Sequence, residues 1–91
     1  MNGAISFTMH LFKEGEMFVA YVPELDLSSC GDTAEVARRN IRDAVRGFLE
    51  ASEKMGTLSE ILEEAGYQRQ GEEWEPPEFI SLESVKVSLH S

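Results

Sequence analysis

Acidic side chains surround the only tryptophan of the chain, close to its C-terminal end. Residues 72–78 read Glu-Glu-Trp-Glu-Pro-Pro-Glu, so four carboxylates flank Trp74. Tryptophan is enriched at the centres of protein interfaces, and carboxylates around it complement a basic partner. Trp74 can instead fold back onto the helices and complete the core, with the glutamates in solvent. The candidate partner-binding residues are therefore Glu72, Glu73, Trp74, Glu75 and Glu78.

A second group of carboxylates, Glu24, Asp26, Asp32 and Glu35, is close in sequence. Clustered carboxylates can bind Mg²⁺ through oxygen ligands. Helix capping explains Asp32 and Glu35 more simply, because an Asp followed three residues later by a Glu has the form of a capping box, with Thr33 as the alternative cap. We predict no metal site here.

Nucleophilic and histidine-based chemistry lack partner residues. His10 and His90 have no histidine or cysteine at ligand spacing, and we expect His10 on the solvent face of a strand. Cys30 precedes a helix start, where a thiol pKa can fall, but a small buried apolar residue is the simpler interpretation. Gly31 is isolated, so no phosphate-binding loop is indicated. We predict no catalytic residue and no cofactor.

Four arginines, Arg38, Arg39, Arg42 and Arg46, lie within nine residues. A basic stripe of this kind can bind phosphates. The interleaved acidic residues at i+3 and i+4 spacing favour ion pairs along a solvated helix face instead. The net charge points the same way, because −9 on 91 residues repels a polyanion.

The charge is concentrated towards the C-terminal end. Residues 57–91 hold two basic and eight acidic side chains, a net of −6, and the preceding part carries −3. Nucleic acids and acidic membranes are disfavoured as partners, whereas a basic protein would be attracted. No signal-peptide pattern and no apolar run of about 20 residues is present. With its single cysteine, the chain is expected to be cytoplasmic.

Hydrophobic periodicity predicts the elements that position these residues. Alternation predicts strands over 4–12 and 25–30, and an apolar run predicts a strand over 17–22 that ends at Pro23. An apolar stripe at helical spacing predicts a helix that follows Thr33 and ends at Gly56. The residues of this stripe are Ala37, Ile41, Ala44, Val45, Phe48 and Leu49. A short second helix is predicted over 57–66.

The remainder of the chain is predicted to be less regular. Residues 67–70 are a candidate short strand, and 71–78 a loop with two prolines. A last strand is expected where Val85, Val87 and Leu89 alternate with polar residues, and its free edge predicts pairing with a second copy. The fold class is α+β: one domain over 1–91, with an antiparallel sheet packed under two helices in the order β-β-β-α-α-β(β). Its core lies at about 4–66, followed by the C-terminal loop and strand at 67–91.

Two linked stretches resemble the HicB antitoxin family. The first is Phe-Val-Ala-Tyr-Val-Pro-Glu-Leu at 18–25, and the second begins with Gly-Asp-Thr at 31–33 and continues through Glu35, Ala37, Asn40, Ile41, Ala44 and Val45. The resemblance covers roughly residues 4–66. It implies a truncated RNase H-like fold and a non-enzymatic role, in which the protein masks the surface of a small basic toxin that cleaves mRNA.

Full-length members of that family often add a C-terminal DNA-binding module. Residues 67–91 offer only loop and strand signals, so we expect a short, stand-alone, self-associating member without direct nucleic-acid binding. One alternative is an oligomeric structural or ligand-binding protein of the same fold without a toxin. Another is a degenerate metal-dependent nuclease that uses Glu24, Asp26 and Asp32.

Overall fold

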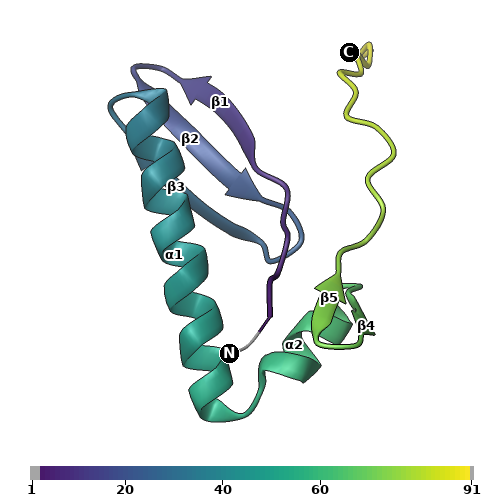
Figure 1. Cartoon of the computed structure of the whole chain (residues 1–91). Coiled ribbons are helices and arrows are strands. Elements are labelled where there is room, and N and C mark those ends of the chain that lie inside the picture. The colour runs from purple at the N-terminus through teal and green to yellow at the C-terminus, as the bar shows by residue number, and fades with distance from the viewer. Residues whose placement is uncertain (1–2, 91) are drawn as a thin grey trace.

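Figure 1 shows the computed structural model of the chain, which describes residues 3–90. Strands β1 (His10–Glu14), β2 (Met17–Val22) and β3 (Leu27–Gly31) form an antiparallel sheet in the order β1-β2-β3. Helices α1 (Ala34–Met55) and α2 (Leu58–Glu64) follow, and then strands β4 (Gln68–Gln70) and β5 (Glu73–Glu75) form a two-stranded sheet. The predicted α+β class and the order of strands and helices are confirmed.

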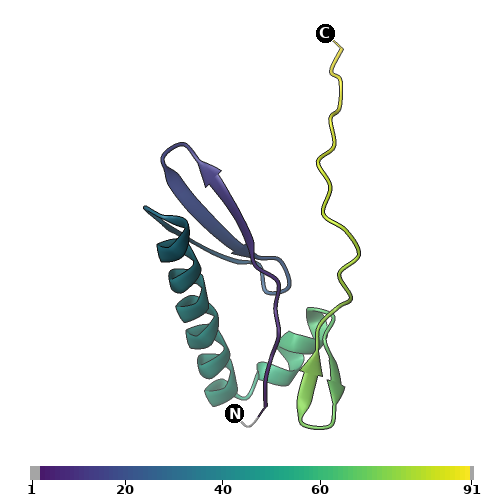
Figure 2. The same cartoon turned by 45° about the horizontal axis from the view of Figure 1, so that its top comes forward.

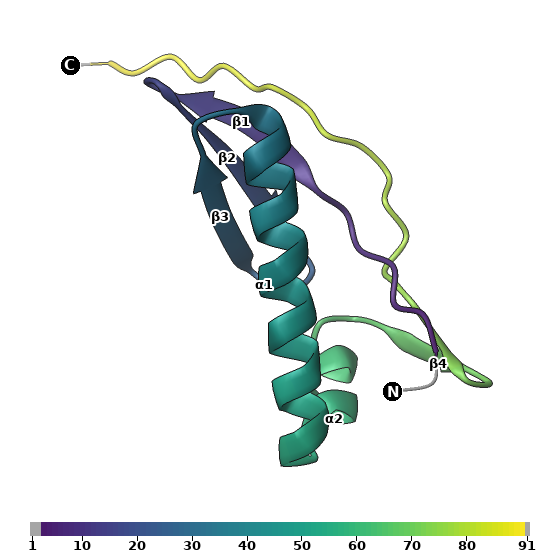
Figure 3. The same cartoon turned by 60° about the vertical axis from the view of Figure 1, so that its left-hand side comes forward.

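The three-stranded sheet has one covered face. Strands β1 and β2 are joined by a tight turn in which Gly15 has a φ of 58°, a value that favours glycine. Ala20 and Val22 of β2 are fully buried beneath α1, whereas Phe12 on the opposite face is 44% exposed. In Figure 3, α1 runs along one side of the sheet and leaves the other side bare.

Helix α1 begins and ends with well-formed caps. The Thr33 hydroxyl accepts a hydrogen bond from the Val36 N–H at 3.1 Å. Thr33 is therefore the N-cap residue, and the prediction that Asp32 caps the helix is wrong. At the other end Gly56 adopts the left-handed conformation. The helix contacts β3, β2 and α2, and one stripe of it is buried: Ala37, Ile41, Val45, Leu49 and Ser52.

Helix α2 and the β4–β5 hairpin lie beyond the end of the sheet (Figure 1). Leu62 of α2 is fully buried, and the backbone N–H of Tyr67 caps the helix end through the Leu62 carbonyl oxygen at 2.9 Å. Thr57 makes no side-chain capping bond; its hydroxyl donates to the Ser52 carbonyl oxygen at 3.4 Å. Helix α2 therefore begins without a side-chain cap.

The segment before β1 ties the two sheets together. The predicted strand over 4–12 is paired in the sheet only from His10, and the ladder continues to Glu14. Upstream of His10, Ile5 forms an isolated parallel bridge with Trp74 of β5. Residues 3–9 therefore span the distance between the three-stranded sheet and the small hairpin, as Figure 2 shows.

Residues 76–90 form neither helix nor strand. The strand predicted at Val85, Val87 and Leu89 is wrong for the isolated chain, because no neighbouring strand accepts or donates its backbone hydrogen bonds. The radius of gyration is 15.6 Å, against about 12 Å for a compact domain of this length. The difference reflects the segment that leaves the folded body (Figures 1 and 2).

Candidate protein-binding surface

The β4–β5 hairpin separates its side chains onto two faces. Gln68 pairs with Glu75 and Gln70 with Glu73, so these four side chains share one face, and all four are exposed. Arg69 pairs with Trp74 on the other face. We call the first face the acidic hairpin face; it consists of Gln68, Gln70, Glu73 and Glu75. It offers only carboxylates and amides, and therefore suits a cationic partner.

Trp74 belongs to the core. It is 8% exposed, it bridges to Ile5, and the Arg69 guanidinium carbon lies 5.6 Å from its ring centroid. The Arg69 Nε–H also donates to the Gly71 carbonyl oxygen at 3.1 Å. Of the two roles considered from sequence, Trp74 thus takes the core role. It fixes the hairpin and does not present its ring to a partner.

The four glutamates of the predicted partner-binding set remain in solvent. Glu72 lies in the hairpin turn, Glu73 and Glu75 lie on β5, and Glu78 follows the two prolines; all are exposed. Sequence reasoning missed Gln68 and Gln70. Their signal was the alternation Gln-Arg-Gln opposite Glu-Trp-Glu across a glycine-containing turn.

Glu24 and Tyr67 form a polar junction beneath the start of the C-terminal segment. Glu24 Oε2 accepts a hydrogen bond from the Thr8 N–H at 2.9 Å, and the Tyr67 hydroxyl donates to the Ser6 carbonyl oxygen at 2.6 Å. Burial raises the pKa of Tyr67 to about 12, and the nearby Glu24 charge adds to the rise. Both bonds fix the segment before β1, so the junction has a structural role.

The carboxylates considered for metal binding do not converge. Glu24 and Asp26 precede β3, and Asp26 accepts a hydrogen bond from the Tyr21 hydroxyl at 2.9 Å, whereas Asp32 follows β3 at its other end. This bond is the main cause that raises the pKa of Tyr21. Between residues 3 and 90, no group of three His, Cys, Asp or Glu residues is arranged to hold a metal ion.

Two other sequence expectations are corrected. Cys30 is exposed, because it lies on the face of β3 that α1 does not cover. His10 is partly buried: its ring meets Tyr21 edge-on at 6.1 Å, and its Nε2 is buried without a hydrogen-bond partner among the described residues. The error at Cys30 concerns which face of the sheet is covered, whereas His10 lies on that same uncovered face, as expected, and its ring meets Tyr21 there.

No helix in the part of the chain that the structure describes is long and apolar enough to cross a membrane. Comparison of the chain with protein-family models, with curated proteins and with solved structures gave no match. The function must therefore be argued from the residues and their arrangement.

Proposed function

We propose that the protein is a binding module, a HicB-like antitoxin of the cytoplasm that neutralises a small basic mRNA-cleaving toxin by covering its surface. The observation that carries this proposal is the acidic hairpin face. Its carboxylates stand on a hairpin held in place by a buried Trp74, and so they are oriented before any partner arrives. Preorganised charge of this kind lowers the entropic cost of binding.

The charge around the hairpin supports the same role. The single basic residue of the hairpin, Arg69, is directed over Trp74 and bonded to Gly71, so it does not neutralise the carboxylates of β5. The exposed Glu72 and Glu78 extend the acidic surface on either side. An RNA-cleaving partner needs a basic surface for its substrate, and an acidic protein surface competes for it by the same electrostatics.

The test is whether any small basic protein encoded beside this gene binds the chain. We expect the two proteins to co-purify at low salt and to separate as salt is raised, because exposed ion pairs are screened. The double variant Glu73→Gln/Glu75→Gln should weaken binding about tenfold or more. Failure of the wild-type proteins to bind at low salt would contradict the proposal.

A matched control is available on the other hairpin. Glu14 and Glu16 flank the exposed turn between β1 and β2, at the far end of the molecule from β5 (Figure 1). Glu14→Gln/Glu16→Gln changes the net charge by the same amount. It should leave the affinity within about twofold of the wild type, since its only effect is on long-range attraction.

A further inference from the structure

The C-terminal arm, which we define as residues 78–90, presents apolar side chains that nothing in the described chain covers. Its exposed large hydrophobics range from 57% at Phe79 to 94% at Leu89. They are Phe79, Ile80, Leu82, Val85, Val87 and Leu89. Contiguous exposed apolar surface of this kind marks an interaction site.

The arm begins within a strongly acidic stretch. Residues 72–83 contain five carboxylates and no lysine or arginine, and the last two, Glu78 and Glu83, enclose Phe79, Ile80 and Leu82. The surface that fits this segment therefore combines an apolar floor with positive charge. Such a surface exists on the same protein.

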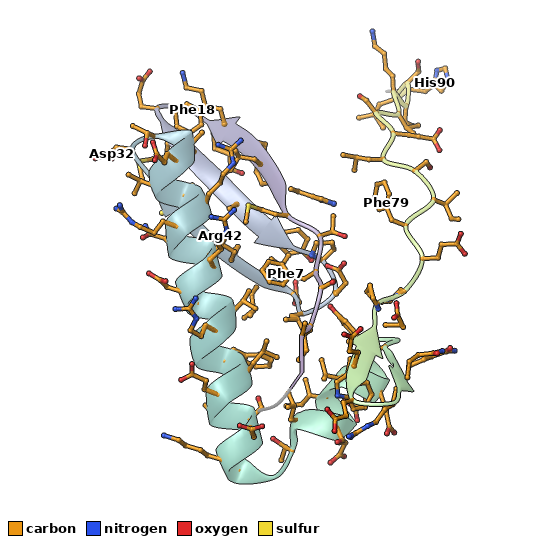
Figure 4. The ribbon with its side chains drawn as sticks, viewed as in Figure 1. Phe7, Phe18, Asp32, Arg42, Phe79 and His90 are labelled. Carbon is orange, nitrogen blue, oxygen red and sulfur yellow. The ribbon has the colours of Figure 1, made fainter. Side chains whose placement is uncertain are left out.

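A groove of about 720 Å³ lies between α1 and the segment before β1. Its floor is formed by Phe7, Val45 and Leu49, and its rim by Arg42 and Arg46, with Lys54 further along the helix. Figure 4 shows Phe7 and Arg42 on this side of the molecule. The groove also contains Glu50 and Glu53 towards the end of α1, so its positive charge is concentrated at the two arginines.

These arginines do not form the intrahelical ion pairs that the sequence favoured. Within residues 3–90, neither Arg42 nor Arg46 has an ion pair or a hydrogen bond from its side chain. Both are exposed. On a chain with a net charge of −9, two arginines without an ion pair beside an apolar floor complement an acidic, apolar segment.

The arm cannot easily reach the groove of its own chain. Pro76 and Pro77 stiffen its exit, and Pro77 Cγ would lie only 3.0 Å from a Cβ placed on Gly66, which fixes the start of the arm against α2. In Figures 1, 2 and 3 the arm runs on the far side of residues 3–9 from α1. There Glu78 and Phe79 line a separate hollow with Ser6, Phe7 and Thr8, whereas the groove adjoins Phe7 on the side of α1.

We infer that the groove between α1 and Phe7 receives the arm of a second copy, residues 78–83, with Glu78 and Glu83 along the basic rim that Arg42, Arg46 and Lys54 form and with Phe79 and Leu82 at the apolar floor. Six extended residues span about 20 Å and the stretch of α1 from Arg42 to Lys54 about 18 Å, so residues 78–83 match the groove in length. Two such contacts related by a twofold axis close the assembly as a dimer. The inference does not depend on the proposed function.

The experiment uses the full chain and measures mass by light scattering across a concentration series. We expect a dimer whose dissociation constant rises at least about tenfold in Arg42→Glu/Arg46→Glu and, separately, in Glu78→Arg/Glu83→Arg. The matched control is Arg38→Glu/Arg39→Glu, which lies on the same helix outside the groove and makes the same charge change. It should dimerise within about threefold of the wild type. Far-ultraviolet circular dichroism checks that each variant is folded.

Mixing the two groove and arm variants gives the decisive result. The Arg42→Glu/Arg46→Glu chain has an acidic groove and keeps its acidic arm. The Glu78→Arg/Glu83→Arg chain keeps its basic groove and has a basic arm. In a heterodimer of the two, each arm meets a groove of the opposite charge, so both contacts are restored. We expect the mixture to dimerise at a concentration at which each variant alone is mostly monomeric. A wild-type chain that stays monomeric, an arginine variant that dimerises normally, or a mixture that stays monomeric would each overturn the inference. Glu78 also belongs to the acidic surface proposed for the basic partner, so binding of that partner is scored in the Arg42→Glu/Arg46→Glu variant, which leaves every glutamate of that surface unchanged.

Discussion

The hydroxyl of Tyr67 donates a 2.6 Å hydrogen bond to the backbone carbonyl oxygen of Ser6, across 61 residues of sequence. Tyr67 is 3% exposed and belongs to the core, so the bond is made in a poorly solvated place. It lies beside the Ile5–Trp74 bridge, and together these two contacts hold the segment before β1 against the C-terminal hairpin. The position of the acidic hairpin face therefore depends on them.

Removing this hydroxyl should destabilise the fold. Tyr67→Phe keeps the ring and leaves the Ser6 carbonyl oxygen without its donor, so the free energy of unfolding should fall by about 1–2 kcal/mol at neutral pH. Urea denaturation measures the change. Tyr21→Phe is the control, since its hydroxyl bonds Asp26 at an exposed site and should matter less. Equal losses in the two variants would contradict the role assigned to Tyr67.

Alkaline pH should remove the extra stability that Tyr67 gives the fold relative to phenylalanine at the same position. The pKa of Tyr67 is about 12 in the folded chain against 10.0 for an ordinary tyrosine. A folded pKa above the unfolded value means that the stabilisation is complete below pH 10 and is lost as the pH rises from 10 to about 12. The stability gap between wild type and Tyr67→Phe should therefore shrink across this window. A gap independent of pH would argue against the raised pKa.

The cap of α1 should contribute a measurable part of the stability. Thr33→Ala removes the acceptor of the Val36 N–H and should cost about 1 kcal/mol. Asp32→Ala should cost less, because Asp32 is not the cap residue. Thermal unfolding of both variants tests the assignment, and a larger loss for Asp32→Ala would show that the capping residue is misassigned.

Two glycines should respond in opposite directions to alanine. A Cβ on Gly31 would lie 2.6 Å from Val36 Cγ1 and 2.7 Å from the Ala37 nitrogen, so Gly31→Ala forces β3 and α1 apart and should cost about 1–3 kcal/mol. Gly47 is in the middle of α1 with nothing within 4 Å of its added Cβ. Gly47→Ala should stabilise the protein by about 0.5–1 kcal/mol. Denaturant titration of both variants distinguishes close packing from a general intolerance of substitution.

Local patterns were sufficient to predict much of the fold. The apolar run of β2, the turn at Gly15 and the buried stripe of α1 are properties of neighbouring residues, and the structure contains them as expected. The errors at His10 and Cys30 depend on contacts across the sheet: His10 meets the cross-strand Tyr21 ring on the uncovered face, and Cys30 lies on that same face. Alternation shows that a strand has two faces, but which face is covered depends on where a distant helix packs.

The candidate surface shows the same limit. The acidic segment around Trp74 could be recognised from sequence, but the burial of that ring depends on Ile5, 69 positions away in the chain. Without this contact the sequence favours the core role for the tryptophan but leaves the interface role open. The strand expected at 85–89 depends on a partner edge, and no local pattern supplies one.

The bridge between Ile5 and Trp74 also bears on the order of folding. During synthesis β1, β2, β3 and α1 leave the ribosome first, and their contacts are close in sequence, so they can form early. Residues 3–9 can form their contact with Trp74 only after the last quarter of the chain has been synthesised. Until translation reaches β5, the apolar side of α1 next to Phe7 is only loosely closed. A fragment that ends before Trp74 should therefore aggregate through the exposed apolar side of α1 next to Phe7.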